Sequence, residues 1–122
     1  MSKTGGRRIL IVEDEWLIAE TMAQTLRDYG YEIVGPVASV ESACRAIEHS
    51  PPDAALLDVS LGAGETSYPV ARRLASSGVR FAFLTGYAQL NLPGEFRGST
   101  LLSKPVPSDA LERVIAELVG ER

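Results

Sequence analysis

Apolar residues gather in five short runs along the chain, separated by longer stretches in which polar residues are frequent. The runs show little alternation between apolar and polar side chains, which is typical of strands buried on both faces of a sheet. We expect strands at 9–12 (ILIV), 31–37 (YEIVGPV), 54–58 (AALLD), 80–85 (RFAFLT) and 100–103 (TLLS).

Between these runs, apolar residues recur at helical spacing. Helices are predicted within 15–30, 39–49, 68–78 and 107–120. Ser39 and Ser108 are placed to cap two of them, because a serine oxygen accepts hydrogen bonds from the free N–H groups of a first turn. Gly30 should end the first helix. We expect the inward stripe of that helix to reach Tyr29, and Trp16 to pack as a partly buried residue at its start.

Strands and helices therefore alternate, which predicts an α/β protein with a parallel sheet covered on both faces. The exception is the segment 86–99, GYAQLNLPGEFRGS. Pro93, Gly94 and Gly98 interrupt its apolar pattern, so we expect one short turn of helix there and otherwise irregular chain.

Polar residues stand at the carboxyl ends of four predicted strands. Glu13 and Asp14 follow the first strand, and Asp58 ends the third. Thr85 ends the fourth strand and Lys104 follows the fifth. Because the carboxyl ends of parallel strands share one edge of the sheet, we expect these five side chains to converge on a ligand site.

This set of residue types favours phosphoryl chemistry on a metal ion. Three clustered acids repel one another, and a hard cation such as Mg²⁺ would neutralise them with oxygen ligands. A carboxylate beside Mg²⁺ and Lys104 could attack a phosphoryl group and form an acyl phosphate. Thr85 and Lys104 could then hold phosphoryl oxygens. Each residue alone also has a structural explanation, since Asp is common in turns.

Composition limits the other possibilities. The 122 residues predict one domain, which we place at 8–122 after a flexible polar tail at 1–7. A net charge of −4 argues against nucleic acid as a partner. No apolar run approaches the roughly 18 residues of a membrane span, and the start MSKTGGRR lacks the apolar region of a secretory signal. The single cysteine suits the cytoplasm.

The motifs together resemble the response-regulator receiver domains of two-component signalling. The resemblance rests on VED at Glu13 and Asp14, LLD at Asp58, LTG at Thr85 and SKP at Lys104, in this order. It covers about residues 8–120 and implies a flavodoxin-like (βα)₅ fold, a doubly wound five-stranded parallel sheet with helices on both faces. The strand FLTGY is similar to the subgroup with a Phe-x-Thr-Gly-Tyr fourth strand, which is often paired with unorthodox sensor histidine kinases.

The resemblance implies a role for each matching residue. Asp58 would be the phosphoacceptor, receiving the phosphoryl group from a phosphohistidine on a sensor histidine kinase. Mg²⁺ would be bound by the carboxylates of Asp14 and Asp58, by the main-chain carbonyl of Ser60, and by Glu13 through water. Such a domain catalyses only its own phosphorylation and dephosphorylation, and signals through contacts with a downstream protein, which the sequence does not name.

The resemblance also implies that Thr85 and Lys104 contact the phosphoryl group, and that the Lys104–Pro105 bond is cis. One position departs from the family. The usual switch aromatic lies three residues before the lysine, where this chain has Leu101. Tyr87 could replace it or could be an ordinary exposed loop residue. We expect 86–99 and the face toward the last helix to form the output surface.

Two alternatives remain at this stage. A Mg²⁺-dependent phosphohydrolase could use Asp58 as nucleophile, but such enzymes commonly carry an acid two residues later, where this chain has Ser60. A receiver-like module that is never phosphorylated would not need the complete set of acids, threonine and lysine. The sequence alone also allows either a stand-alone regulator or a phosphate sink.

Overall fold

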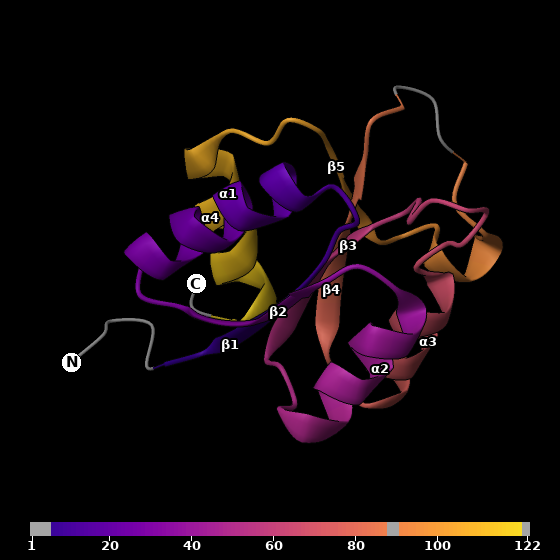
Figure 1. The fold of residues 1–122 in the computed structure, drawn as a ribbon, viewed down its shortest axis with the longest axis horizontal. Helices are drawn as coiled ribbons and strands as arrows, with labels where there is room; N and C mark the ends of the chain where they lie inside the picture. Colours follow the sequence, from indigo (N-terminus) through magenta and orange to yellow (C-terminus); the bar gives the residue numbers. More distant parts are fainter. Residues whose placement is uncertain (1–5, 88–90, 121–122) are drawn as a thin grey trace.

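A computed structural model describes residues 6–87 and 91–120. Five parallel strands form one sheet with the order β2-β1-β3-β4-β5, which confirms the predicted class (Figure 1). The strands are β1 (Arg8–Val12), β2 (Glu32–Val37), β3 (Ala54–Asp58), β4 (Arg80–Thr85) and β5 (Thr100–Ser103). The chain changes direction across the sheet between β1 and β3, the position at which open parallel sheets bind ligands.

Four helices cover the sheet. They are α1 (Trp16–Asp28), α2 (Val40–His49), α3 (Tyr68–Ser76) and α4 (Ser108–Leu118). Figure 1 shows α1 beside α4 on one face and α2 beside α3 on the other. The N-cap predicted at Ser39 forms, since its side chain accepts a hydrogen bond from the Ser42 backbone amide. Every helix in 6–87 and 91–120 is too short or too polar to traverse a lipid bilayer.

The core consists of two apolar layers separated by the sheet. In β1, Ile9 and Ile11 pack toward α1 and α4, whereas Leu10 and Val12 pack toward α2 and α3. All four of these side chains are fully buried. The unbroken apolar runs of the sequence therefore have the predicted cause, because both faces of the central strands are covered.

The described part of the connection between β4 and β5, residues 86–87 and 91–99, contains one short turn as expected, the 3₁₀ helix η1 (Gly94–Phe96). Phe96 is buried, and its ring lies within 6.0 Å of the rings of Tyr68, Phe81 and Phe83, measured between centroids. This one side chain supplies part of the apolar cover that α2 and α3 do not provide. Residues 88–90 of the predicted irregular segment lie outside the described chain.

Three local predictions were wrong. Tyr29 is exposed, because it is the C-cap of α1 and lies beyond the inward stripe. Trp16 is 74% exposed rather than partly buried, because α1 begins at the rim of the sheet. Pro107, not Ser108, is the N-cap of α4: its extended backbone precedes the helix, and its carbonyl accepts from the Leu111 amide at 2.9 Å.

Two arginines at the amino ends of the strands hold the C-terminal end of α4 against that edge of the sheet. Arg7 donates to the Val119 carbonyl at 2.9 Å, and Arg80 donates to the Glu117 carbonyl at 3.1 Å. Cations at this position also suit the negative end of the helix dipole. Of the tail predicted at 1–7, residues 1–5 lie outside the described chain.

Candidate functional site at the carboxyl edge of the sheet

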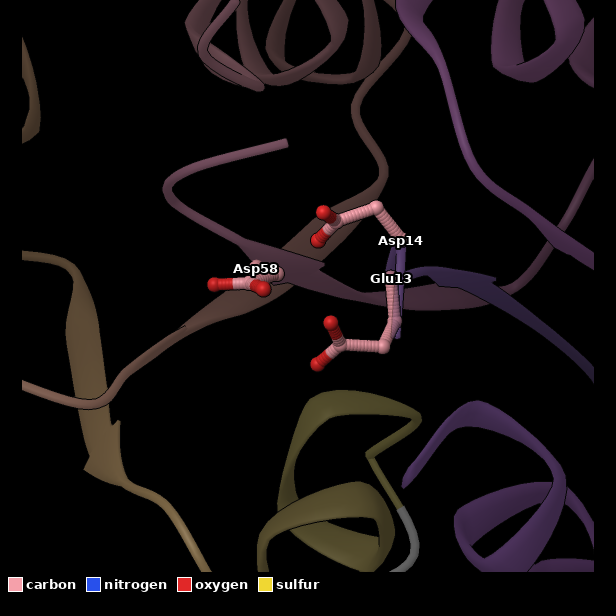
Figure 2. Close-up of side chains that lie close together, drawn as sticks. All are labelled: Glu13, Asp14 and Asp58. Atoms are coloured by element: carbon pink, nitrogen blue, oxygen red, sulfur yellow. The ribbon is translucent and has the colours of Figure 1, made fainter. Parts of the chain in front are cut away.

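Three acids meet where β1 and β3 end. Carboxylate oxygens of Glu13, Asp14 and Asp58 lie within 4.8 Å of one another. Figure 2 shows the three side chains turned toward a common space. Glu13 and Asp58 are buried, whereas Asp14 is exposed. The parallel register explains this meeting, because Val12 pairs with Leu57 and the residues that follow leave the sheet at the same edge.

Lys104 joins these acids from the end of β5. Its Nζ donates to Asp58 Oδ2 at 2.9 Å, to Glu13 Oε1 at 3.1 Å and to Glu15 Oε1 at 3.4 Å. The Lys104 side chain is only 12% exposed. The Lys104–Pro105 peptide bond is cis, as predicted, and Gly35–Pro36 is a second cis bond that the sequence did not indicate.

Thr85 completes the rim from β4 and is buried. Its Oγ1 accepts a hydrogen bond from the Tyr87 amide at 3.0 Å. A cavity of about 350 Å³ opens over Asp14, Asp58, Thr85 and Lys104, and its wall includes Ser60, Gly62 and Tyr87. Leu101 lies away from this cavity, at the edge strand, and is 39% exposed.

Burial and charge crowding alter the protonation of the cluster. Burial, followed by the neighbouring Asp58 carboxyl, raises the pKa of Glu13 to about 7. Burial opposes the charge of Lys104, but its hydrogen bonds to Asp58 and Glu13 outweigh that effect, so the pKa of Lys104 lies above its ordinary value. We therefore take Lys104 as protonated. One ammonium cannot neutralise all the acids around it, so the negative charge of the neighbouring Asp58 adds to the larger effect of burial on the Glu13 pKa.

The donor set fits a divalent cation. The three acids offer oxygen ligands, which suit Mg²⁺ or Ca²⁺ rather than a soft metal. The combination of one exposed and two buried carboxylates leaves an open side toward the cavity. A cation at this point would favour the ionised carboxylates and relieve their mutual repulsion.

The structure also contains two features that the sequence analysis missed. The first is that Lys104 donates a hydrogen bond to Glu15. The only signal for this contact in the sequence is the position of Glu15 directly after the acid pair. Gly62 has a φ of +83°, and a β-carbon there would lie 3.2 Å from Asp14 Oδ2. The glycine pair of LGAGE signalled a turn, but its close approach to an acid depends on how that turn folds back.

Comparison with known proteins identifies the family. Residues 9–116 match the family described as the response regulator receiver domain. The solution structure of SdrG from Sphingomonas melonis Fr1 is 39% identical, with a TM-score of 0.81 over 93% of this chain and 96% of that chain. The PhyR response regulator REC domain of Erythrobacter litoralis is 25% identical, with a TM-score of 0.84 over 95% and 92%.

A curated relative is the transcriptional regulatory protein PdtaR of Mycobacterium tuberculosis strain H37Rv. It is 38% identical over 90 residues, which cover 70% of this chain and 42% of that protein. The chain therefore matches less than half the length of this curated relative.

The chain belongs to the response regulator receiver domains of two-component signalling. Its acid cluster lies where the ligand site of such an open parallel sheet is expected. Membership of this family argues against the phosphohydrolase alternative, because a receiver domain is not a conventional enzyme.

Proposed function

We propose that Asp58 accepts a phosphoryl group from a phosphohistidine of a sensor histidine kinase, in a reaction that requires Mg²⁺. The observation that carries this proposal is the position of Asp58: its carboxylate is buried, held by Lys104 at 2.9 Å, and lies within 4.8 Å of two other acids. A buried carboxylate with a fixed ammonium beside it is oriented for attack and has groups nearby for the charge that arrives.

In the proposed step, an oxygen of Asp58 forms a bond to phosphorus while the phosphorus–nitrogen bond of the phosphohistidine breaks. The imidazole nitrogen leaves with the electron pair, and Asp58 becomes a mixed anhydride of carboxylic and phosphoric acids. Lys104 pairs with one phosphoryl oxygen and the Thr85 hydroxyl bonds to another. Thr85 reaches the rim from the neighbouring strand, since Asp58 pairs with Leu84 in the sheet.

Glu13, Asp14 and Asp58, with the Ser60 main-chain carbonyl, would hold the metal ion. When bound, Mg²⁺ supplies positive charge to a phosphoryl oxygen and neutralises the acids. Trp16 lies two residues after Asp14 and is exposed, so its fluorescence should report metal binding. A titration with Mg²⁺ should change this signal in the natural chain and have a much smaller effect after Asp14→Asn.

Mass spectrometry tests the phosphoacceptor. Acetyl phosphate with Mg²⁺ should add one phosphoryl group to the natural chain, and Asp58→Asn should abolish the addition. Asp28→Asn is the matched control, because Asp28 is an exposed carboxylate at the far end of α1 and should leave the reaction unchanged. A phosphoryl group that still forms in Asp58→Asn at the natural rate would refute the assignment.

The same proposal includes a switch at Tyr87 rather than at Leu101. Tyr87 is 69% exposed, and its amide is hydrogen-bonded to the Thr85 side chain, so a movement of that hydroxyl toward a phosphoryl group would reach it directly. We also propose that this chain belongs to the Phe-x-Thr-Gly-Tyr subgroup, because residues 83–87 read Phe-Leu-Thr-Gly-Tyr. A downstream protein would then bind the surface around Tyr87 and Leu101.

Tyr87→Ala tests this assignment. It should leave the phosphorylation of Asp58 intact and weaken binding of the phosphorylated chain to its downstream protein. Leu101→Ala is the comparison at the family's usual position.

The chain's one cysteine suits the reducing cytoplasm, where we expect this transfer to take place.

A further inference from the structure

Glu15 provides the third acidic contact of Lys104. An ammonium has three N–H donors, and Lys104 directs hydrogen bonds to three carboxylates, those of Asp58, Glu13 and Glu15. All of its donors are therefore engaged. A phosphoryl oxygen that pairs with Lys104 must displace one of these partners.

The three partners differ in how easily they can leave. The contacts of Asp58 and Glu13 are the shorter two, at 2.9 and 3.1 Å, and both side chains are buried. The Glu15 contact is the longest at 3.4 Å, and its side chain is 62% exposed. Water can solvate the Glu15 carboxylate after it is released, whereas a buried carboxylate would lose its partner without that compensation. Glu15 is therefore the partner that yields.

The backbone explains why Glu15 is available for this contact. It stands at the N-cap position of α1, but its side chain makes no capping hydrogen bond. Its amide donates to Glu13 Oε2 at 3.1 Å, which fixes the residue beside the cluster. Glu15 also lines both the cavity over Asp58 and a more apolar cavity beside α1. A group entering the site meets this negative charge.

We propose that Glu15 is a positioning residue that acts as a gate on Lys104. Before phosphorylation it holds the ammonium and repels free anions, and it must release the ammonium when the phosphoryl group arrives. The gate therefore disfavours small, doubly charged phosphoryl donors. A phosphohistidine on a protein is affected less, because other contacts of that protein can contribute to binding. This inference rests on the proposed phosphorylation of Asp58.

Glu15→Gln tests the gate through the initial rate of phosphorylation, followed as intact-protein mass with Mg²⁺. With acetyl phosphate, a dianion near neutral pH, the variant should react about two- to fivefold faster than the natural chain, in line with the modest strength of an exposed charge pair. With phosphoramidate, a monoanion, the gain should be smaller. Raising the ionic strength should reduce both differences, because salt screens exposed charges.

Two further variants distinguish a charge effect from a loss of structure. Glu20→Gln removes the same charge from α1 but lies outside both cavities, so its rate should match that of the natural chain. Glu15→Asp keeps the charge on a shorter side chain and should give a rate between those of the natural chain and Glu15→Gln. If Glu15 had a merely structural role, the change of rate in Glu15→Gln would not depend on the charge of the donor or on the salt concentration.

The outcomes separate this inference from the proposed function. If Asp58 is phosphorylated but Glu15→Gln reacts at the natural rate with both donors and at every ionic strength, the gate is refuted and the phosphoacceptor stands. If acetyl phosphate and phosphoramidate leave Asp58 unmodified in the natural chain and in all variants, the proposed function fails and the gate fails with it.

Discussion

The segments that follow β3 and β4 both begin at a residue of the site, Asp58 and Thr85, but they continue in different ways. After β3, the chain forms a loop closed by its own backbone. Leu61 donates to the Glu65 carbonyl at 2.9 Å, and Glu65 donates to the Gly62 carbonyl at 2.9 Å. The loop then enters the regular helix α3.

After β4, the chain has no comparable helix within 86–87 and 91–99, the described residues of this segment. Its fixed point is Phe96, whose ring fills the space beside Phe81 and Phe83. The bond between the Tyr87 amide and Thr85 holds the near end. The segment after β3, which contains the candidate metal ligand Ser60, is therefore fixed by its own hydrogen bonds. The described part of the segment after β4 is fixed mainly by the Phe96 ring.

The largest expected effect tests that anchor. Phe96→Ala should destabilise the fold by about 3–5 kcal/mol, because it removes a buried ring and leaves a cavity. Leu74→Ala in α3, at a fully buried position, should cost a similar amount, about 2–5 kcal/mol. Urea unfolding measures both. A loss below about 1 kcal/mol for Phe96→Ala, in the range of ordinary surface substitutions, would contradict its role as the anchor.

The next effect concerns the loop after β3. Gly62→Ala and Gly64→Ala should each destabilise the fold by about 1 kcal/mol or more, because both glycines have a positive φ that alanine adopts poorly. Only at position 62 would the new β-carbon approach Asp14, at 3.2 Å. Gly62→Ala should therefore also weaken Mg²⁺ binding, followed by Trp16 fluorescence. Equal Mg²⁺ affinity in the two variants would show that Gly62 does not shape the cluster.

A pH dependence should distinguish the acid cluster from the rest of the fold. The pKa of Glu13 rises from 4.5 to about 7 on folding, so the folded state binds the proton more tightly than the unfolded state. The resulting stabilisation is fully present below pH 4.5 and is lost as the pH rises through about 7.

Urea unfolding in a chelator between pH 4.5 and 8 should show this loss superimposed on the titration of other groups. Glu13→Gln should reduce the loss, and Mg²⁺ should oppose it by favouring the ionised carboxylate. The same pH profile for the natural chain and Glu13→Gln would contradict the shift.

The smallest effect concerns the ion pair that joins η1 to α3. Arg72 donates to both carboxylate oxygens of Glu95, and its guanidinium lies 5.8 Å from the centroid of the Phe96 ring. Both partners are about half exposed, so water and salt screen the attraction. Arg72→Ala should lower the melting temperature far less than Phe96→Ala, and added salt should shrink the difference. If Arg72→Ala lowered the melting temperature as much as Phe96→Ala, the ion pair rather than the Phe96 ring would be what fixes this segment.

The strands and the convergence of polar residues were predictable because each follows from a local pattern. The run AALLD is apolar until its last residue, so the strand and the placement of Asp58 at its end could be inferred together. Parallel register then brought Glu13 and Asp14 to the same edge. The arrangement required only the order of the strands, not the details of packing.

The remaining features depend on packing that no short segment encodes. The exposure of Trp16 depends on where α1 crosses the rim, and the cap at Pro107 depends on the path out of β5. The contact between Glu15 and Lys104 joins residues 89 positions apart. The roles of Tyr87 and Leu101 stay predictions, because their exposure describes one state of the chain.

The hydrogen bond between Arg7 and the Val119 carbonyl places the entry to β1 beside the exit from α4. A short peptide bridge could therefore splice these two points together, and new ends could be opened in an exposed loop elsewhere. Because the acid cluster lies at the other end of the strands, this new connection would leave the cluster undisturbed. The same closeness would let the domain be grafted as a cassette into a loop of a host protein, with Asp58 facing away from the graft.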